Sequence, residues 1–417
     1  MKHLIIENLG PIKRVDVELN RFNFFIGPQS SGKSTIAKVI STCSWVEKEV
    51  ATTMKEGAIG GSAEFVEQIE RFHKLQGYFC SKTEIQYESD IVKISYKENS
   101  LDIHLKTKTQ YRRGKISYMP AERNMITTPD LEGFEFKHTN LRSFLFDWYK
   151  ARDLFKSENK ANILNLGVKY YYDPTETKFK DRIEHVNGVS YNIPLYSASS
   201  GLQSVVPLYV MMQYYTDKYF ESFNDRTSFD LDSKMEEIRR RCVVEFVLKP
   251  YYGDSYNDAE RKKFVDDANA KLRDHDEEMH GLYEKYRAAV DRLTIPVKTD
   301  FIIEEPEQNL YPFTQIDLLQ TLTALCRHER NHGFTITTHS PYILNYLNVM
   351  LMRGMKAVED KPSIKAEDLC VYVVQNGGVM DLMQTNVITG SKSVNAEWLN
   401  QAMREMYGEY KELKAME

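Results

Sequence analysis

The sequence predicts an α/β fold organised around a phosphate-binding loop. Three observations lead to this fold class: a Gly-rich loop lies between an apolar strand and a helix, a second apolar strand ends in two carboxylates, and a third ends in a histidine. Predicted strands and helices alternate on both sides of these motifs, which is typical of a sheet covered by helices. The 417-residue chain is long enough for more than one such unit.

The loop is the most specific of these signals. Residues 27–34 read Gly-Pro-Gln-Ser-Ser-Gly-Lys-Ser, a complete G-x-x-x-x-G-K-[ST] motif, with an apolar strand at 22–26 and a helical pattern at 33–45. Its glycines allow the backbone to wrap a phosphate, Lys33 reaches the β- and γ-phosphates, and the Ser34 hydroxyl binds Mg²⁺. The motif therefore predicts ATP and Mg²⁺ as ligands. The predicted nucleotide-binding residues here are Gly27, Pro28, Gln29, Ser30, Ser31, Gly32, Lys33, Ser34 and Thr35.

The second strand, residues 299–305, is expected to supply the acids. Its end reads Phe-Ile-Ile-Glu-Glu, a Walker B pattern, and we expect the strand to lie beside the P-loop strand. Glu304 would hold Mg²⁺, and Glu305 would orient and deprotonate the attacking water. Alone, the pattern also fits two exposed acids at the end of a buried strand. The P-loop shifts the balance to function.

Two further segments have weaker signals. His339 follows the apolar strand at 334–338, where an imidazole can touch the γ-phosphate and sense hydrolysis. We therefore assign Lys33, Glu305 and His339 to catalysis. Residues 199–203 read Ser-Ser-Gly-Leu-Gln before a predicted helix that Ser200 could cap, with a terminus that would attract an anion. Taken by itself, this segment is better explained by a plain helix cap.

Composition limits the partners and the compartment. The chain is 42% hydrophobic and 28% charged, with a net charge of −5 and five scattered cysteines. No CxxC pair or long apolar run occurs in it, so we expect a cytoplasmic protein without zinc, disulfides or a membrane segment. A basic cluster at 106–115 is the only candidate for nucleic-acid contact, and we expect weak binding or none.

Together, these elements resemble the head of ABC-type ATPases. That group includes the structural-maintenance-of-chromosomes (SMC) proteins, double-strand-break repair ATPases, the recombination protein RecF and the overcoming-lysogenization-defect (OLD) ATPases. The resemblance implies an ABC-type P-loop NTPase head with a mixed β-sheet core and helical insertions. It also implies a head-to-head dimer or higher oligomer in which a signature segment, with Ser200, Gly201 and Gln203, completes the partner's nucleotide site.

Two runs favour the OLD-like branch. Residues 304–312 read Glu-Glu-Pro-Glu-Gln-Asn-Leu-Tyr-Pro and look like its E-E-P-E-x-H-L-H-P signature, while residues 118–123 are similar to its Y-x-P-A-E-R segment. Asn309 and Tyr311 replace the two histidines, and Leu202 stands where transporters carry a second glycine. Because the segment after His339 is short, we expect this chain to lack the nuclease (Toprim) domain of OLD proteins.

An ATPase without its own nuclease is similar to the ATPase subunits of the PARIS and Septu phage-defence systems. That resemblance implies a separate effector nuclease or toxin and a phage protein as trigger. The alternative is a repair head of the RecF or double-strand-break type that binds DNA. A third possibility is a scaffold that binds ATP and rarely hydrolyses it.

Four segments are expected along the chain. Residues 1–125 form an N-terminal ATPase lobe, and 126–230 a mixed and mostly helical region with the signature. Residues 231–295 form a charged helical insertion that acts as a lid or docks another protein. Residues 296–417 form a C-terminal lobe with the Walker B strand and His339.

Overall fold

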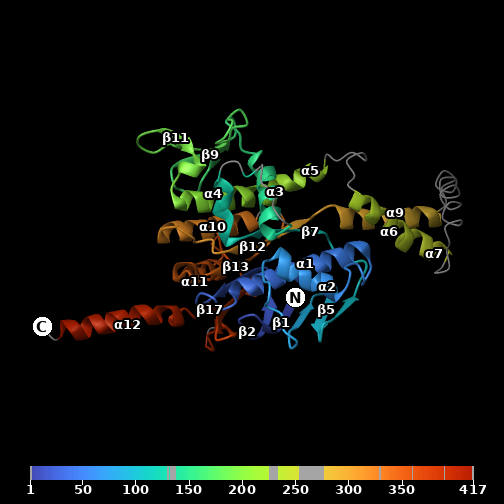
Figure 1. Cartoon of the computed structure of the whole chain (residues 1–417), viewed down its shortest axis with the longest axis horizontal. Coiled ribbons are helices and arrows are strands. Elements are labelled where there is room, and N and C mark those ends of the chain that lie inside the picture. The colour runs from blue at the N-terminus through green and yellow to red at the C-terminus, as the bar shows by residue number, and fades with distance from the viewer. Residues whose placement is uncertain are drawn as a thin grey trace.

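The computed structural model describes residues 2–128, 131, 138–224, 233–252, 277–327, 330–358, 360–388 and 390–415 (Figure 1). Its centre is a six-stranded sheet of order β15-β14-β3-β13-β12-β7. Five strands run parallel and β15 is antiparallel, so the predicted α/β class with a mixed central sheet is confirmed. The strands are β3 (Phe22–Ile26), β7 (Gly114–Met119), β12 (Lys298–Glu304), β13 (Gly333–Thr338), β14 (Leu369–Gln375) and β15 (Gly378–Asp381).

The expected neighbourhood of the P-loop strand was wrong. Strand β12, which carries the acids, is not paired with β3, because β13 lies between them and bonds to both. All three strands are apolar and nearly fully buried, so local sequence gives no pairing order. Because the strands are parallel, their carboxyl ends still meet at one edge of the sheet.

Helices and a second sheet cover the two faces of the central sheet. On one side, α1 (Lys33–Thr53) shares a core with an antiparallel sheet of order β2-β1-β4-β5-β6. Neighbouring residues of β3 alternate between the two cores: Phe25 belongs to this one and Phe24 to the other. The antiparallel strands are β1 (Lys2–Leu9), β2 (Ile12–Leu19), β4 (Glu84–Glu88), β5 (Val92–Lys97) and β6 (Ser100–Leu105).

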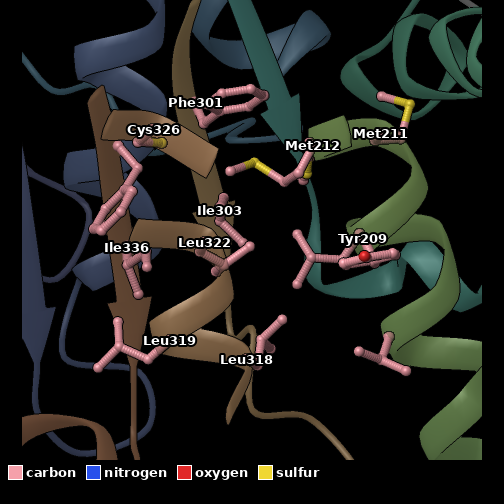
Figure 2. Packing of buried hydrophobic residues seen from close by; sticks show 14 of the residues in the cluster. Tyr209, Met211, Met212, Phe301, Ile303, Leu318, Leu319, Leu322, Cys326 and Ile336 are labelled. Carbon is pink, nitrogen blue, oxygen red and sulfur yellow. The ribbon is translucent and has the colours of Figure 1, made fainter. Parts of the chain in front are cut away.

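The other face of the central sheet is covered by helices. Figure 2 shows Ile303 of β12 and Ile336 of β13 against leucines of α10 (Pro312–Arg327), with α4 (Ser200–Gln213) close by. Each such apolar side chain is almost fully buried, which fixes α4 and α10 against the strand ends. Helices α3 (Asn140–Arg152) and α11 (Pro341–Met355) complete this layer.

Residues 126–230 hold strands as well as helices, in keeping with a mixed region. Between α3 and α4 lies a four-stranded antiparallel sheet, β11-β10-β9-β8. Its best strand reads Val-Lys-Tyr-Tyr-Tyr, residue types that favour strands, and Tyr170 packs 5.6 Å from the Trp148 ring of α3. The strands are β8 (Ala161–Asn162), β9 (Val168–Tyr172), β10 (Asp181–His185) and β11 (Tyr191–Pro194).

The charged insertion is helical where the structure describes it. Helices α6 (Ser233–Val243), α7 (Lys249–Tyr252) and α9 (Glu277–Thr294) form an arm that extends from the body (Figure 1). Part of the predicted helical insertion, residues 253–276, lies outside the described residues. The four-segment division stays a prediction. Of the helices described, none is apolar enough over a sufficient length to cross a bilayer.

Short elements complete the chain. A hairpin of β16 (Met383–Thr385) and β17 (Lys392–Val394) leads to the last helix, α12 (Glu397–Lys414), which points away from the body in Figure 1. Helices α2 (Ser62–Glu67) and α5 (Tyr219–Asn224) are single short segments, each adjoining a π-helical turn.

Candidate nucleotide-binding and hydrolysis site

The P-loop connects the carboxyl end of β3 to the first turn of α1. Gly27 has a φ of 157°, and a Cβ there would lie 2.1 Å from the Val374 carbonyl oxygen of β14. Gly32 precedes the helix with a φ of 105°, which L side chains rarely adopt. The two glycines thus have the conformational role that the motif predicts.

Lys33 is folded back over the loop. Its ammonium donates to the carbonyl oxygens of Gly27 at 3.0 Å and Pro28 at 2.6 Å. Burial lowers the pKa of Lys33 to about 8, against the opposing attraction of Glu305 and Glu307. The buried Ser31 hydroxyl oxygen has no hydrogen-bond partner among the described residues. An ammonium held by carbonyls and an unsatisfied hydroxyl fit a loop that receives phosphate oxygens.

The two residues predicted to hold Mg²⁺ are in contact. The Ser34 hydroxyl hydrogen-bonds to the Glu304 carboxylate, which also accepts a hydrogen bond from the Tyr118 hydroxyl of β7. Burial raises the pKa of Glu304, and these hydrogen bonds and Lys38 oppose that rise. One hydroxyl and one carboxylate suit Mg²⁺, which keeps waters and takes its other ligands from nucleotide phosphates.

Glu305 and His339 lie together at the ends of adjacent strands. The Glu305 carboxylate is 3.5 Å from the Nε2 atom of His339 and about one third exposed, so water can reach it. Its backbone has a φ of 43°, held by a hydrogen bond from its N–H to the Thr337 carbonyl at 2.8 Å. Behind them, the Glu307 carboxylate accepts a hydrogen bond from the backbone N–H of His339 at 2.7 Å. Burial raises the pKa of Glu307.

Arg123 is a residue whose role the sequence reasoning missed. Its guanidinium is fully buried and donates to the carbonyl oxygens of Glu304 and Glu305, both at 2.7 Å, and of Ser204 at 3.0 Å. It thereby joins the end of β12 to helix α4. The segment 118–123 was noted only for its resemblance, and no local signal gave Arg123 or Glu307 a function.

The signature segment begins α4, but its cap differs from the prediction. Ser199, not Ser200, is the N-cap, and its side chain accepts the Leu202 N–H at 3.4 Å. The Gln203 amide donates to the carbonyl oxygens of Tyr196 and Ala198, in the segment just before α4. Within the described ranges, no hydrogen bond or ion pair joins Ser200, Gly201 or Gln203 to the P-loop or to the Walker B carboxylates. Ser200 at this helix terminus is exposed.

The depressed pKa of Lys33 predicts how nucleotide affinity depends on pH. The negative phosphates of a bound nucleotide favour the charged ammonium, so nucleotide binding raises the pKa of Lys33 above about 8. Binding is then at full strength below pH 8 and weakens as pH rises above it, with proton uptake on binding. Calorimetry at pH 8.5 in buffers of different ionisation enthalpy should detect that uptake. The Lys33→Arg variant, which stays charged throughout, should show none, and equal uptake in both proteins would contradict the assignment.

The chain is only distantly similar to the known proteins named below. No family model matches it. No curated protein matches it either. Similar solved structures include an SMC head domain from Thermotoga maritima (10% identity, 91% of this chain and 97% of that one, TM-score 0.36). Another is RecF bound to a nucleotide analogue (11% identity, 91% of this chain and 97% of that one, TM-score 0.31). A third is the ADP form of a transporter ATP-binding cassette (12% identity, 91% of this chain and 90% of that one, TM-score 0.26).

Proposed function

We propose that this protein is an ABC-type ATPase that binds ATP and Mg²⁺ and hydrolyses ATP to ADP and phosphate. One observation supports this most: Lys33, Ser34, Glu304, Glu305 and His339 meet at the carboxyl edge of three adjacent parallel strands. Mg²⁺ bound at Ser34 and Glu304 would neutralise charge on the phosphates. Glu305 would accept the proton of the water that attacks the γ-phosphorus as the bond to the β-phosphate oxygen breaks. Phosphate release by the purified chain tests this proposal.

Hydrolysis would take place between two copies of the chain. A single P-loop leaves the outer face of the γ-phosphate open, and a helix N-terminus supplies N–H donors and a positive dipole for it. The first turn of α4 has an exposed Ser200 and, among the described residues, no hydrogen bond to its own P-loop, so it suits this role in a partner. Its position is fixed by Asn309, whose amide donates to Ser204 at 3.0 Å.

Mixing two inactive variants tests the shared site. Lys33→Ala removes the phosphate-binding ammonium, and Ser200→Arg blocks the α4 terminus with a bulky side chain. Each alone should lack turnover, whereas the mixture should regain phosphate release, because a mixed dimer keeps one site with an intact P-loop and an intact α4. Normal turnover by Ser200→Arg alone at every protein concentration would exclude the shared site.

The biological setting is a further step that rests on the resemblance of 304–312 and 118–123 to the OLD-like branch. We propose that the chain is the ATPase and sensor subunit of an anti-phage system, and that it controls a separate effector nuclease or toxin after a phage protein triggers it. The arm of α6, α7 and α9 is the proposed docking surface for such a protein. Protection from phage by the chain and its neighbouring gene, lost in Lys33→Ala, would support this setting.

The basic cluster gives little support to the DNA-repair alternative. Lys106 pairs with Glu88 at 2.6 Å, Lys108 with Glu245 at 2.7 Å and Lys115 with Asp147 at 2.6 Å. Paired cations release few counterions on meeting a phosphate backbone. We therefore keep the expectation that any DNA binding is weak and secondary.

A further inference from the structure

Helix α12 carries an apolar stripe with no cover from the rest of the described chain. Four large side chains on its outer half, Met406, Tyr407, Tyr410 and Leu413, are 57%, 61%, 60% and 58% exposed. Figure 1 shows the helix pointing away from the body with the C-terminus at its far end. Single exposed apolar residues are common, but a cluster of four within two turns is typical of a contact surface.

The base of this helix is held firmly, so the stripe has a defined direction. The Asn348 side chain of α11 makes two hydrogen bonds with the Val394 backbone of β17, at 2.9 and 2.7 Å. The Asn395 N–H donates to the Leu382 carbonyl at 2.8 Å. The helix therefore projects from an anchored hairpin, with its apolar stripe beyond reach of the core.

The spacing of the stripe is that of a coiled coil. Met406, Tyr410 and Leu413 follow one another at intervals of four and three residues, and the same spacing of apolar residue types runs back through the sequence to Met403 and Leu399. These are the a and d positions of a heptad, with Met406 and Leu413 at d and Tyr410 at a. A seam of this kind packs against another helix and not against a flat surface.

Charges beside the seam select the partner. With Tyr410 at position a, Glu409 takes position g and Lys414 takes position e of the next heptad. In a parallel two-stranded coil, each g residue faces the e residue of the following heptad in the other helix. A second copy of α12 thus brings Glu409 opposite Lys414 twice, once on each side. The polar face carries both signs, including Glu405, Lys411 and Glu412, unlike the Lys- and Arg-rich helices that lie on membranes.

We propose that α12 pairs in parallel with α12 of a second copy of the chain, forming a self-contact separate from the nucleotide site. The helix spans little more than two heptads and would be a weak contact in isolation. When paired α12 helices join two heads, they raise the effective concentration of each head around the other. The heads therefore stay associated through cycles of ATP binding and release.

Site-specific cross-linking tests this proposal in the full chain. The exposed Cys80 is first changed to Ser, since the other four cysteines are buried. Leu413→Cys, at a seam position, should then form an intermolecular disulfide under mild oxidation, with or without ATP. Lys411→Cys, on the outer face, is the matched control and should give much less. Adding Lys33→Ala should leave the Leu413→Cys cross-link intact, which separates this proposal from the nucleotide-driven dimer.

A charge exchange tests the parallel orientation. Glu409→Lys and Lys414→Glu should each weaken self-association in sedimentation at least several-fold, and the double variant should restore it. Equal cross-linking at 411 and 413, no cross-link at 413, or a double variant as weak as either single one would overturn the proposal. Binding of a monomeric chain to lipid vesicles through this helix would do the same.

Discussion

Glu305→Gln should bind ATP and fail to hydrolyse it. Glutamine keeps the size of the side chain and can still contact His339, now 3.5 Å from the carboxylate, but it cannot accept a proton from water. Loss of a general base commonly lowers turnover by about 10²-fold or more. Phosphate release should fall by that factor, while nucleotide retained after rapid gel filtration should rise. Because trapped ATP should hold two heads together at the shared site, the variant should also sediment as a dimer at a lower protein concentration than the wild type.

The control for this prediction is Glu88→Gln, the same chemical change in an exposed carboxylate paired with Lys106. It should leave turnover unchanged. His339→Ala adds a second comparison, since it removes the neighbour of Glu305 and keeps the carboxylate. We expect slower hydrolysis but some residual turnover. Wild-type turnover in Glu305→Gln would remove this residue from the role of base.

The features whose position in the fold was predicted correctly from sequence depend on short segments. The P-loop is such a feature, because its glycines, Lys33 and Ser34 act through one strand, one turn and one helix. The positions of the acids at 304 and 305 and of the histidine at 339 were predicted in the same way, since each follows a short run that is typical of a buried strand, and their roles in hydrolysis stay predictions. Parallel strands align their ends, so correct strand assignments were enough to bring these residues together.

The features that sequence missed depend on contacts between distant segments. Pairing order was mispredicted because β3, β12 and β13 are all buried on both faces, so any of them fits any position. The roles of Arg123 and Glu307 arise only when β7, β12 and α4 are assembled. The cap of α4 moved by one residue because Ser199 and Ser200 are equally suited to it, and the backbone decides between them.

Arg123→Lys should lower turnover far more than it lowers nucleotide affinity. The arginine fork holds the backbone carbonyls of Glu304 and Glu305 from one side, and Glu305 has a strained backbone with a φ of 43°. Lysine keeps the charge but lacks the planar fork, so it cannot hold both carbonyls in the same geometry. A displacement of the catalytic carboxylate by about 1 Å can cost about 10²-fold in rate. The P-loop and Lys33 follow another strand, β3, and Arg123 does not hydrogen-bond to them, so the Kd for ATP should change little.

Two further variants separate positioning from simple loss of stability. Arg123→Met leaves buried carbonyls without donors, at about 1–3 kcal/mol each, and should lower the Tm as well as turnover. Arg240→Lys, an exposed arginine paired with Glu236 one helical turn away, is the matched control and should change neither. If Arg123 acts only through folding, turnover per folded molecule in Arg123→Lys will equal that of the wild type. If it positions the Walker B end, kcat will fall at temperatures well below the Tm. The phosphate release regained by mixing Lys33→Ala with Ser200→Arg should then also weaken when Arg123→Lys is added, because the same guanidinium holds the Ser204 carbonyl of α4 at 3.0 Å.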